Sequence, residues 1–335
     1  MIGRKKVLIT NFAGLIVTLS INGVLMLTRQ NPLFLIASGV FYDLTGGFGI
    51  LLTVLFASVA ANGDDDSRLY RIIIIDLALL LPSLIMTPVG MWIKKYGLDY
   101  IYDIVFAADA LIILTMIVAL VYYADNRVYH PDTLKMHFRK IGSSLKQVWF
   151  TPSATGAFLW VLSFSFFVRI FGSWGAGSIN QLYLQSPPFS WDAELYSIYS
   201  TENGVIAFFS FVVVGFMSSC NLGHFTILYV SYLSFFVYFV LFGTVKTTHG
   251  LFFVNGICLF HSGTLSITRA LMSKMVDKDL QGTLFVIPGI LQSIAQSSGA
   301  LTYATLYEER AFEIHGPSLR RSVDYHIVMA HCQIK

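Results

Sequence analysis

The sequence predicts an all-α protein that crosses a membrane several times. Of its 335 residues, 55% are hydrophobic and only 12% are charged, whereas soluble domains carry about 25% charged residues. The mean hydropathy of +0.67 agrees with this composition. A soluble fold of this length has too small an interior for so many Phe and Leu side chains. The bilayer must therefore be the solvent for much of the surface.

Nine apolar stretches are long enough to be spanning helices, which need about 20 mostly apolar residues. Four precede a long polar break and five follow it. In chain order they are Val7–Thr28, Leu33–Ala61, Tyr70–Trp92, Tyr100–Tyr123, Thr155–Gly177, Tyr196–Met217, His224–Val245, Gly250–Ala270 and Gly282–Tyr307. The pattern divides the chain into a first bundle (1–123), a linker (124–153), a second bundle (154–307) and a polar tail (308–335).

Lys and Arg residues in the loops predict the orientation, because cytoplasmic loops are enriched in them. With the N-terminus inside, the inner segments carry twelve, at 4–6, 68–71, 127–146 and 274–278, and the outer loops carry four, at 29, 94–95 and 246. We expect the linker to be cytoplasmic, although the tail, with four basic residues on the outer side, opposes the rule. Within the linker, residues 138–149 have the pattern of an amphipathic helix that lies on the anionic inner leaflet.

No metal, cofactor or nucleic-acid partner is predicted. The three cysteines, Cys220, Cys258 and Cys332, show no metal-ligand or disulfide spacing. Asp64, Asp65 and Asp66 lack a second acidic cluster that would help them hold Mg²⁺ and a diphosphate, so we expect a solvated turn. An enzyme would also need a convergent set of catalytic groups, which the sequence does not offer, and a G-protein-coupled receptor would need seven spans.

Several predicted spans contain charged side chains, which cost roughly 2.5–3.5 kcal/mol at mid-bilayer and usually face a cavity or a partner. Asp109 and Arg169 lie nearest the middle of their spans and are candidates to pair across the bundles, either as a permanent salt bridge or as a gate. Asp76 follows four isoleucines, and desolvation there favours a neutral acid that exchanges protons. The alternative is an ionised Asp76 paired with Arg68 or Arg71.

Two further polar side chains belong to the predicted span that begins at Gly250. Arg269 is near its cytoplasmic end, where composition alone favours a side chain that reaches the lipid headgroups. His261 precedes it by eight residues, just over two helical turns, so both can face the same side. His261 is either a packed core histidine or a proton relay.

Several segments in order resemble solute carrier family 46, a family of major facilitator transporters that includes the proton-coupled folate transporter. Tyr183–Trp191 (YLQSPPFSW) resembles the family's outer loop after its seventh span, and Thr268–Phe285 resembles its tenth and eleventh spans. Arg68–Asp76 resembles the approach to its fifth span, and Asp43 with LTGG after it resembles its fourth. Gly3–Lys6 (GRKK) resembles the loop after its second span; the other interpretation of this basic start is a signal anchor.

The resemblance implies an incomplete major facilitator fold, in which family spans three to six precede the linker and spans seven to eleven follow it. It implies alternating-access transport of a small, folate-like or other organic anion, coupled to protons, at the plasma membrane or a lysosomal or endosomal membrane. Arg269 then binds the anionic solute, since its planar fork holds a carboxylate with two hydrogen bonds, and Asp76 carries the proton. Asp43 is a further candidate. The alternatives are a truncated, inactive gene product or a membrane receptor.

Overall fold

The computed structural model describes residues 4–28, 47–61, 68–84, 101–122, 134–150, 153–220 and 222–315, together with a few isolated positions between 34 and 45. Every described element is an α-helix or a short 3-10 helix. Asp43, the Asp64–Asp66 cluster and the chain beyond residue 315 lie outside the described residues.

The helices form two groups in the sequence, separated by α7 (Leu134–Trp149). The first group contains α1 (Arg4–Leu27), α3 (Gly47–Ala61), α4 (Arg68–Leu84) and α6 (Ile101–Tyr122). The second contains α8 (Ala154–Gln185), α9 (Ala193–Ser219), α10 (His224–Thr244), α11 (Thr248–Ile257), η2 (Leu259–Gly263), α12 (Thr264–Lys274), η3 (Lys278–Leu280), α13 (Gln281–Leu284) and α14 (Val286–His315).

Local sequence explains where the helices of the second group begin. Ser153 precedes α8 and its hydroxyl accepts a hydrogen bond from the backbone N–H of Gly156 at 3.0 Å. Asp192 accepts from Leu195 N–H at 2.8 Å at the start of α9. Thr247 accepts from Gly250 N–H at 3.3 Å before α11. Each oxygen satisfies a backbone donor that the first turn of a helix leaves free.

Five described helices are long and apolar enough to cross a membrane, and a sixth span results if the bent pair Thr248–Ile257 and Leu259–Lys274 is one span. Their outer faces carry exposed apolar side chains such as Phe216, Tyr229 and Phe236, which are 67%, 71% and 67% exposed. Such faces suit lipid, because a bilayer does not penalise exposed hydrocarbon. The chain is a multi-pass membrane protein.

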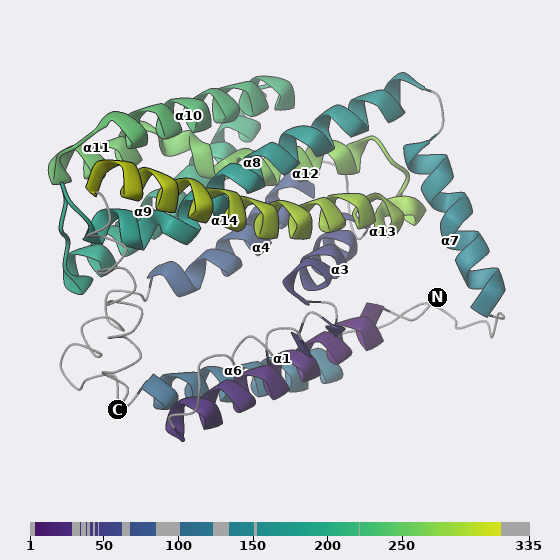
Figure 1. Ribbon diagram of the computed structural model, residues 1–335. Coiled ribbons are helices and arrows are strands. Elements are labelled where there is room, and N and C mark those ends of the chain that lie inside the picture. Colours follow the sequence, from purple (N-terminus) through teal and green to yellow (C-terminus); the bar gives the residue numbers. More distant parts are fainter. Residues whose placement is uncertain are drawn as a thin grey trace.

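The two groups pack side by side and meet through a few helices (Figure 1). Within the first group α1 packs along α6, and within the second α14 packs along α8. Contacts between the groups are made by α4 with α9 and α12, and by α3 with α13 and α14. The largest cluster of buried apolar residues lies at this junction and includes Phe56, Ile72, Leu159, Ile267 and Phe285.

The helices that could cross a membrane correspond to six of the nine predicted spans, one of them as the bent pair. Among the described residues the other three, Leu33–Ala61, Tyr70–Trp92 and Tyr100–Tyr123, are represented by α3, α4 and α6, which are not in that set. The predicted span Gly250–Ala270 is bent by 55° between Ile257 and Leu259, near Gly256 and Gly263. Helix α14 continues to His315, eight residues into the predicted polar tail. Helix α8 has 32 residues, longer than the predicted Thr155–Gly177. The linker contains the predicted helix, which starts four residues earlier than expected, at Leu134.

Candidate functional site: a buried ion pair between the two helix groups

Asp76 and Arg269, predicted separately as proton carrier and anion ligand, are partners in the structure. Asp76 lies in the middle of α4 and Arg269 in the middle of α12, and 193 residues separate them in sequence. Nη1 of Arg269 donates to Oδ1 of Asp76 at 3.0 Å. Asp76 is 8% exposed and Arg269 is 4% exposed. The ion pair therefore joins the two helix groups within the packed interior.

Two polar side chains complete the hydrogen bonds of this pair. The hydroxyl of Ser266, one turn before Arg269 on α12, donates to the second carboxylate oxygen of Asp76. Nη2 of Arg269 donates to Oε1 of Gln292 on α14 at 3.5 Å. Each oxygen of the carboxylate thus has a donor, and the guanidinium reaches two helices besides its own. A buried charge pair needs such supplementary bonds to offset its lost hydration.

Aromatic rings enclose the guanidinium of Arg269 from two helices. Its Cζ lies 4.1 Å from the ring centroid of Phe56 on α3. The ring of Phe166 on α8 is 5.2 Å away. Both distances are within the range of cation–π attraction, which is stronger where the cation is desolvated. The rings also exclude water, so the guanidinium cation is stabilised by the protein groups that surround it.

A second set of contacts joins the groups near the end of α12, on the side predicted to be cytoplasmic. Nη1 of Arg68, at the start of α4, donates to the backbone carbonyl of Ser273 at 2.6 Å. The side chain of Gln281 donates to the carbonyls of Ser273 and Val276 at 2.8 and 2.7 Å and accepts from the Ser273 hydroxyl at 2.9 Å. Carbonyls at a helix C-terminus attract cations and donors, so this end is closed by polar contacts.

Small residues bring α3 and α14 close together at the same junction. A Cβ added at Gly289 would lie 2.4 Å from Oγ1 of Thr53, and one added at Gly49 would lie 2.7 Å from Oγ of Ser293. Glycines permit such close backbone approach. Gly47 starts α3 with φ 56°, a left-handed conformation that favours glycine. Gly49 and Gly289 therefore mark a close crossing of α3 and α14.

Asp109 and Arg169, both within the described part of the chain, do not form the predicted pair. Asp109 accepts from the Ser20 hydroxyl, because α6 packs on α1. Arg169 donates from Nη2 to the backbone carbonyl of His261 at 3.3 Å, and its Cζ lies 4.0 Å from the ring of Phe235 on α10. The prediction used depth alone. A permanent salt bridge is therefore not formed, because Asp109 faces α1 while Arg169 faces η2 and α10. A pair that forms only in another conformation, as a gate would, stays a prediction.

His261 lies in η2 at the bend that precedes α12, and its side chain contacts η2 and α10. Its Nδ1 is 2.7 Å from the carbonyl of Cys258, and its ring stacks on Tyr238 with centroids 4.6 Å apart. The described contacts of His261 do not include Arg269, although the two share the segment Leu259–Lys274. The packed-histidine alternative fits these contacts better than a relay next to Arg269.

Comparisons with known proteins identify transporters that are similar to the chain. No protein-family model matches the chain. The chain is 23% identical over 309 residues to the proton-coupled folate transporter of Rattus norvegicus, a match that covers 91% of the chain and 66% of the relative. It is 25% identical over 284 residues to the lysosomal proton-coupled steroid conjugate and bile acid symporter SLC46A3 of Mus musculus, covering 82% and 60%. These homologues are members of solute carrier family 46.

A solved structure decides the fold. The crystal structure of the human organic anion transporter MFSD10 (TETRAN) matches 94% of the chain with a TM-score of 0.70 and 15% sequence identity, over 73% of that chain. The fold is the major facilitator fold. The chain spans about two thirds or less of the first curated relatives' length. In a major facilitator fold the substrate lies between two helix bundles, and Asp76 and Arg269 occupy the corresponding boundary between the two helix groups.

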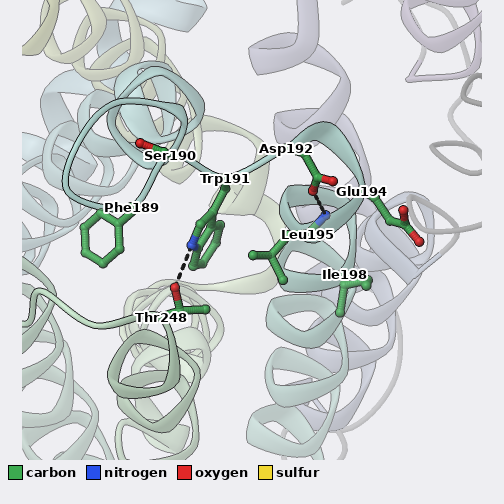
Figure 2. A pocket seen from close by; sticks show the side chains of 8 residues that line it. All are labelled: Phe189, Ser190, Trp191, Asp192, Glu194, Leu195, Ile198 and Thr248. Carbon is green, nitrogen blue, oxygen red and sulfur yellow. Dashed lines mark hydrogen bonds between the residues drawn. The ribbon is translucent and has the colours of Figure 1, made fainter.

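The larger of the two described pockets lies far from this ion pair, at the end of the major facilitator fold opposite α7. It has a volume of about 490 Å³. Its lining residues are Phe189, Ser190, Trp191, Asp192, Glu194, Leu195, Ile198 and Thr248. Two of these are acidic and none is basic. Trp191 donates from Nε1 to Thr248 at 2.9 Å (Figure 2). The pocket therefore does not suit an anion, and we place the candidate site at the ion pair.

Four residues of the site were not predicted from sequence: Phe56, Phe166, Ser266 and Gln292. Ser266 had a usable signal, because it precedes Arg269 by three residues and helical spacing puts both on one face. Gln292 had a weaker one, as a large polar side chain within an apolar stretch. The two phenylalanines had none, since aromatic residues are common in every span. Among the described residues no group of three or more His, Cys, Asp or Glu could hold a metal ion.

Proposed function

We propose that the protein is a proton-coupled transporter of a small organic anion that works by alternating access. The observation that carries this proposal is the buried pair of Asp76 and Arg269 between the two helix groups. A charge pair in this position is costly to bury and has a clear use in a transporter. The names of the relatives support it, since both are proton-coupled transporters, one of folate and one of steroid conjugates and bile acids.

The coupling follows from competition for one guanidinium. An anionic solute needs the donors of Arg269, and the ionised carboxylate of Asp76 already accepts from one of them. Protonation removes the charge of Asp76 and leaves Arg269 as a buried cation among Phe56, Phe166 and Gln292. An anion then restores the neutrality of the site. Proton and anion therefore favour each other's binding, and the coupling is reciprocal by linkage.

The same exchange connects binding to opening of the bundle. While Asp76 is ionised, its ion pair with Arg269 joins α4 to α12 and stabilises contact between the helix groups. When Asp76 is protonated, only a hydrogen bond from the charged guanidinium to a neutral acid remains, and the groups can separate on the side of Arg68 and Ser273. Release of the proton and the anion lets the ion pair form again. A transporter that returns empty in this way moves solute only when a proton moves with it.

The test is solute accumulation by the full-length protein in proteoliposomes, with a folate and a conjugated bile acid as separate probes. An inwardly directed proton gradient is expected to drive uptake of at least one probe above its equilibrium level. Dissipating the gradient with a protonophore should remove the accumulation but not the exchange of labelled for unlabelled solute. Uptake of neither probe, or accumulation that ignores the protonophore, would contradict the proposal.

A further inference from the structure

Helix α7 lies between the two helix groups in the sequence and takes no part in the ion-pair site. Its role therefore needs a separate explanation. Apolar residues recur along it with a spacing of four, three, four and three, at Leu134, Phe138, Ile141, Leu145 and Val148. In an α-helix this spacing forms one continuous stripe. The helix is therefore amphipathic along its whole length, as the sequence of the linker predicts for residues 138–149.

The remaining faces of α7 are basic. The helix contains Lys135, Arg139, Lys140 and Lys146 and no acidic residue. Lys135, Arg139 and Lys146 follow one another at intervals of four and seven, which places them on the same side next to the apolar stripe. Described side chains of this polar surface, including Arg139 and Lys146, are exposed. A helix with four basic groups beside an apolar stripe is complementary to an anionic lipid surface.

The helix is anchored at its C-terminal end. Trp149 is 1% exposed and Val148 is buried, and both belong to the main apolar cluster. The N-terminal part of α7 leads away from this anchor across the ends of α8 and α13, and does not run alongside them (Figure 1). A helix that crosses the ends of spanning helices lies along the membrane surface, on the side where the two groups are joined by Arg68 and Ser273.

Exposed aromatic rings indicate the level of the lipid headgroups along the molecule. Phe150 is 61% exposed and Trp160, on the second turn of α8, is 39% exposed. Their ring centroids are 5.9 Å apart. The indole N–H of Trp160 donates to the carbonyl of Trp149 at 2.9 Å. Exposed Trp and other aromatic residues with such polar partners gather at the headgroup level of membranes. The junction of α7 and α8 is therefore at the headgroup level.

We propose that α7 binds anionic lipid headgroups of the leaflet on its side of the membrane. The apolar side of the helix faces the acyl boundary, and the basic side, which includes Arg139 and Lys146, contacts phosphate and carboxylate groups of the lipids. The occupant is the lipid surface itself. The contact would hold the connection between the two helix groups at a fixed depth while they move.

The experiment measures which lipid surrounds α7 in the full-length protein in nanodiscs. A fluorophore is attached at Gly142→Cys, where an added Cβ meets nothing within 4 Å, after Cys332 and the exposed Cys220 are replaced by serine. The nanodiscs contain phosphatidylcholine with a trace of either phosphatidylserine or phosphatidylcholine that carries a nitroxide at the top of its acyl chain. At low salt the nitroxide on phosphatidylserine is expected to quench several-fold more strongly.

Salt and charge removal test the cause of this preference. Concentrated KCl should remove it, since the Debye length falls from about 10 Å at 0.1 M to about 3 Å at 1 M. The triple variant Lys135→Gln, Arg139→Gln, Lys146→Gln should also remove it, since each basic residue near an anionic surface changes lipid occupancy by up to about fivefold. The matched control, Lys94→Gln, Lys95→Gln, Lys246→Gln, removes three charges from loops predicted to lie on the opposite side of the membrane and should preserve it.

Three results would overturn the proposal: equal quenching by both lipids at low salt, a preference that persists in concentrated KCl, or no quenching by either lipid. A triple variant that keeps the preference would do the same. The salt series is measured on the protein with the basic residues of α7 unchanged. It therefore tests whether the lipid preference is electrostatic even if the triple variant fails to fold.

Discussion

Replacement of Arg269 by alanine is the sharpest perturbation of the site. It removes the ion pair with Asp76, the hydrogen bond to Gln292 and the stacking on Phe56 and Phe166 together. Under the proposed function it also removes the donors that hold the anionic solute. Both binding and stability should therefore change, and the two effects must be measured separately.

The structure gives the expected size of each effect. A charge-assisted hydrogen bond to a ligand is worth roughly 1.5–3 kcal/mol, which corresponds to a rise in KM of roughly 10- to 150-fold. Loss of one partner from a buried ion pair costs about 3–5 kcal/mol of stability. The double variant Asp76→Asn, Arg269→Ala leaves no unpaired buried charge. It should therefore recover part of the lost stability but none of the lost affinity.

The assay is exchange of labelled solute in proteoliposomes, which reports KM without a proton gradient, together with thermal unfolding of the same preparations. Arg269→Lys should recover part of the affinity, because lysine keeps the charge and loses the planar fork. Arg169→Ala is the matched control, since Arg169 is also buried and stacked on a ring, and it contacts a backbone carbonyl of η2. It should lower the unfolding temperature and leave KM nearly unchanged.

An Arg269→Ala protein that is folded and exchanges solute with the original KM would refute this reasoning. Equal increases of KM in Arg169→Ala and Arg269→Ala would also count against it. In that case the effect would reflect a general loss of packing and not the contact with the solute.

Three other predictions concern topology, coupling and packing. Cysteines introduced in the linker and at the N-terminus should react with a labelling reagent only when it reaches the cytoplasmic side of the membrane. Labelling of the linker from outside intact cells would contradict the orientation. Asp76→Asn should retain exchange and lose accumulation driven by a pH gradient, whereas Asp109→Asn, whose partner is Ser20, should retain both; the reverse result would identify the wrong acid. Gly299→Ala, whose Cβ would lie 2.6 Å from the backbone carbonyl of Phe171, should cost about 1–3 kcal/mol of stability in thermal unfolding, while Gly243→Ala, which meets nothing within 4 Å, should not.

The sequence is a good guide to the fold because lipid simplifies the problem. A helix in the bilayer must satisfy its own backbone and present apolar side chains outward, so length and hydropathy suffice to find most of the helices. The same rule does not show where a helix bends. The bend near Cys258 depends on a local 3-10 turn whose carbonyls are bonded by His261 and Thr264, and apolar composition continues across it without interruption.

The charged residues of the site were found from sequence, but their pairing was not. The free-energy cost of a charged side chain in the bilayer is enough to identify the residues that need partners: Asp76, Arg269, Asp109 and Arg169. Depth in the membrane then suggested Asp109 with Arg169. Pairing also depends on which helix faces are in contact, and that is a property of the assembled bundle. The contact of α4 with α12 brings Asp76 to Arg269, and the contact of α6 with α1 brings Asp109 to Ser20.

The central claim is that a proton on Asp76 and an anion on Arg269 bind together. The most direct test is the affinity for the transported anion as a function of pH, measured by equilibrium binding to the full-length protein. We expect Kd to rise about tenfold for each pH unit above the pH at which Asp76 titrates, as linkage to one proton requires. In Asp76→Asn the affinity should be high and independent of pH. An Asp76→Asn protein whose affinity follows pH as steeply as that of the unmodified protein would contradict the claim.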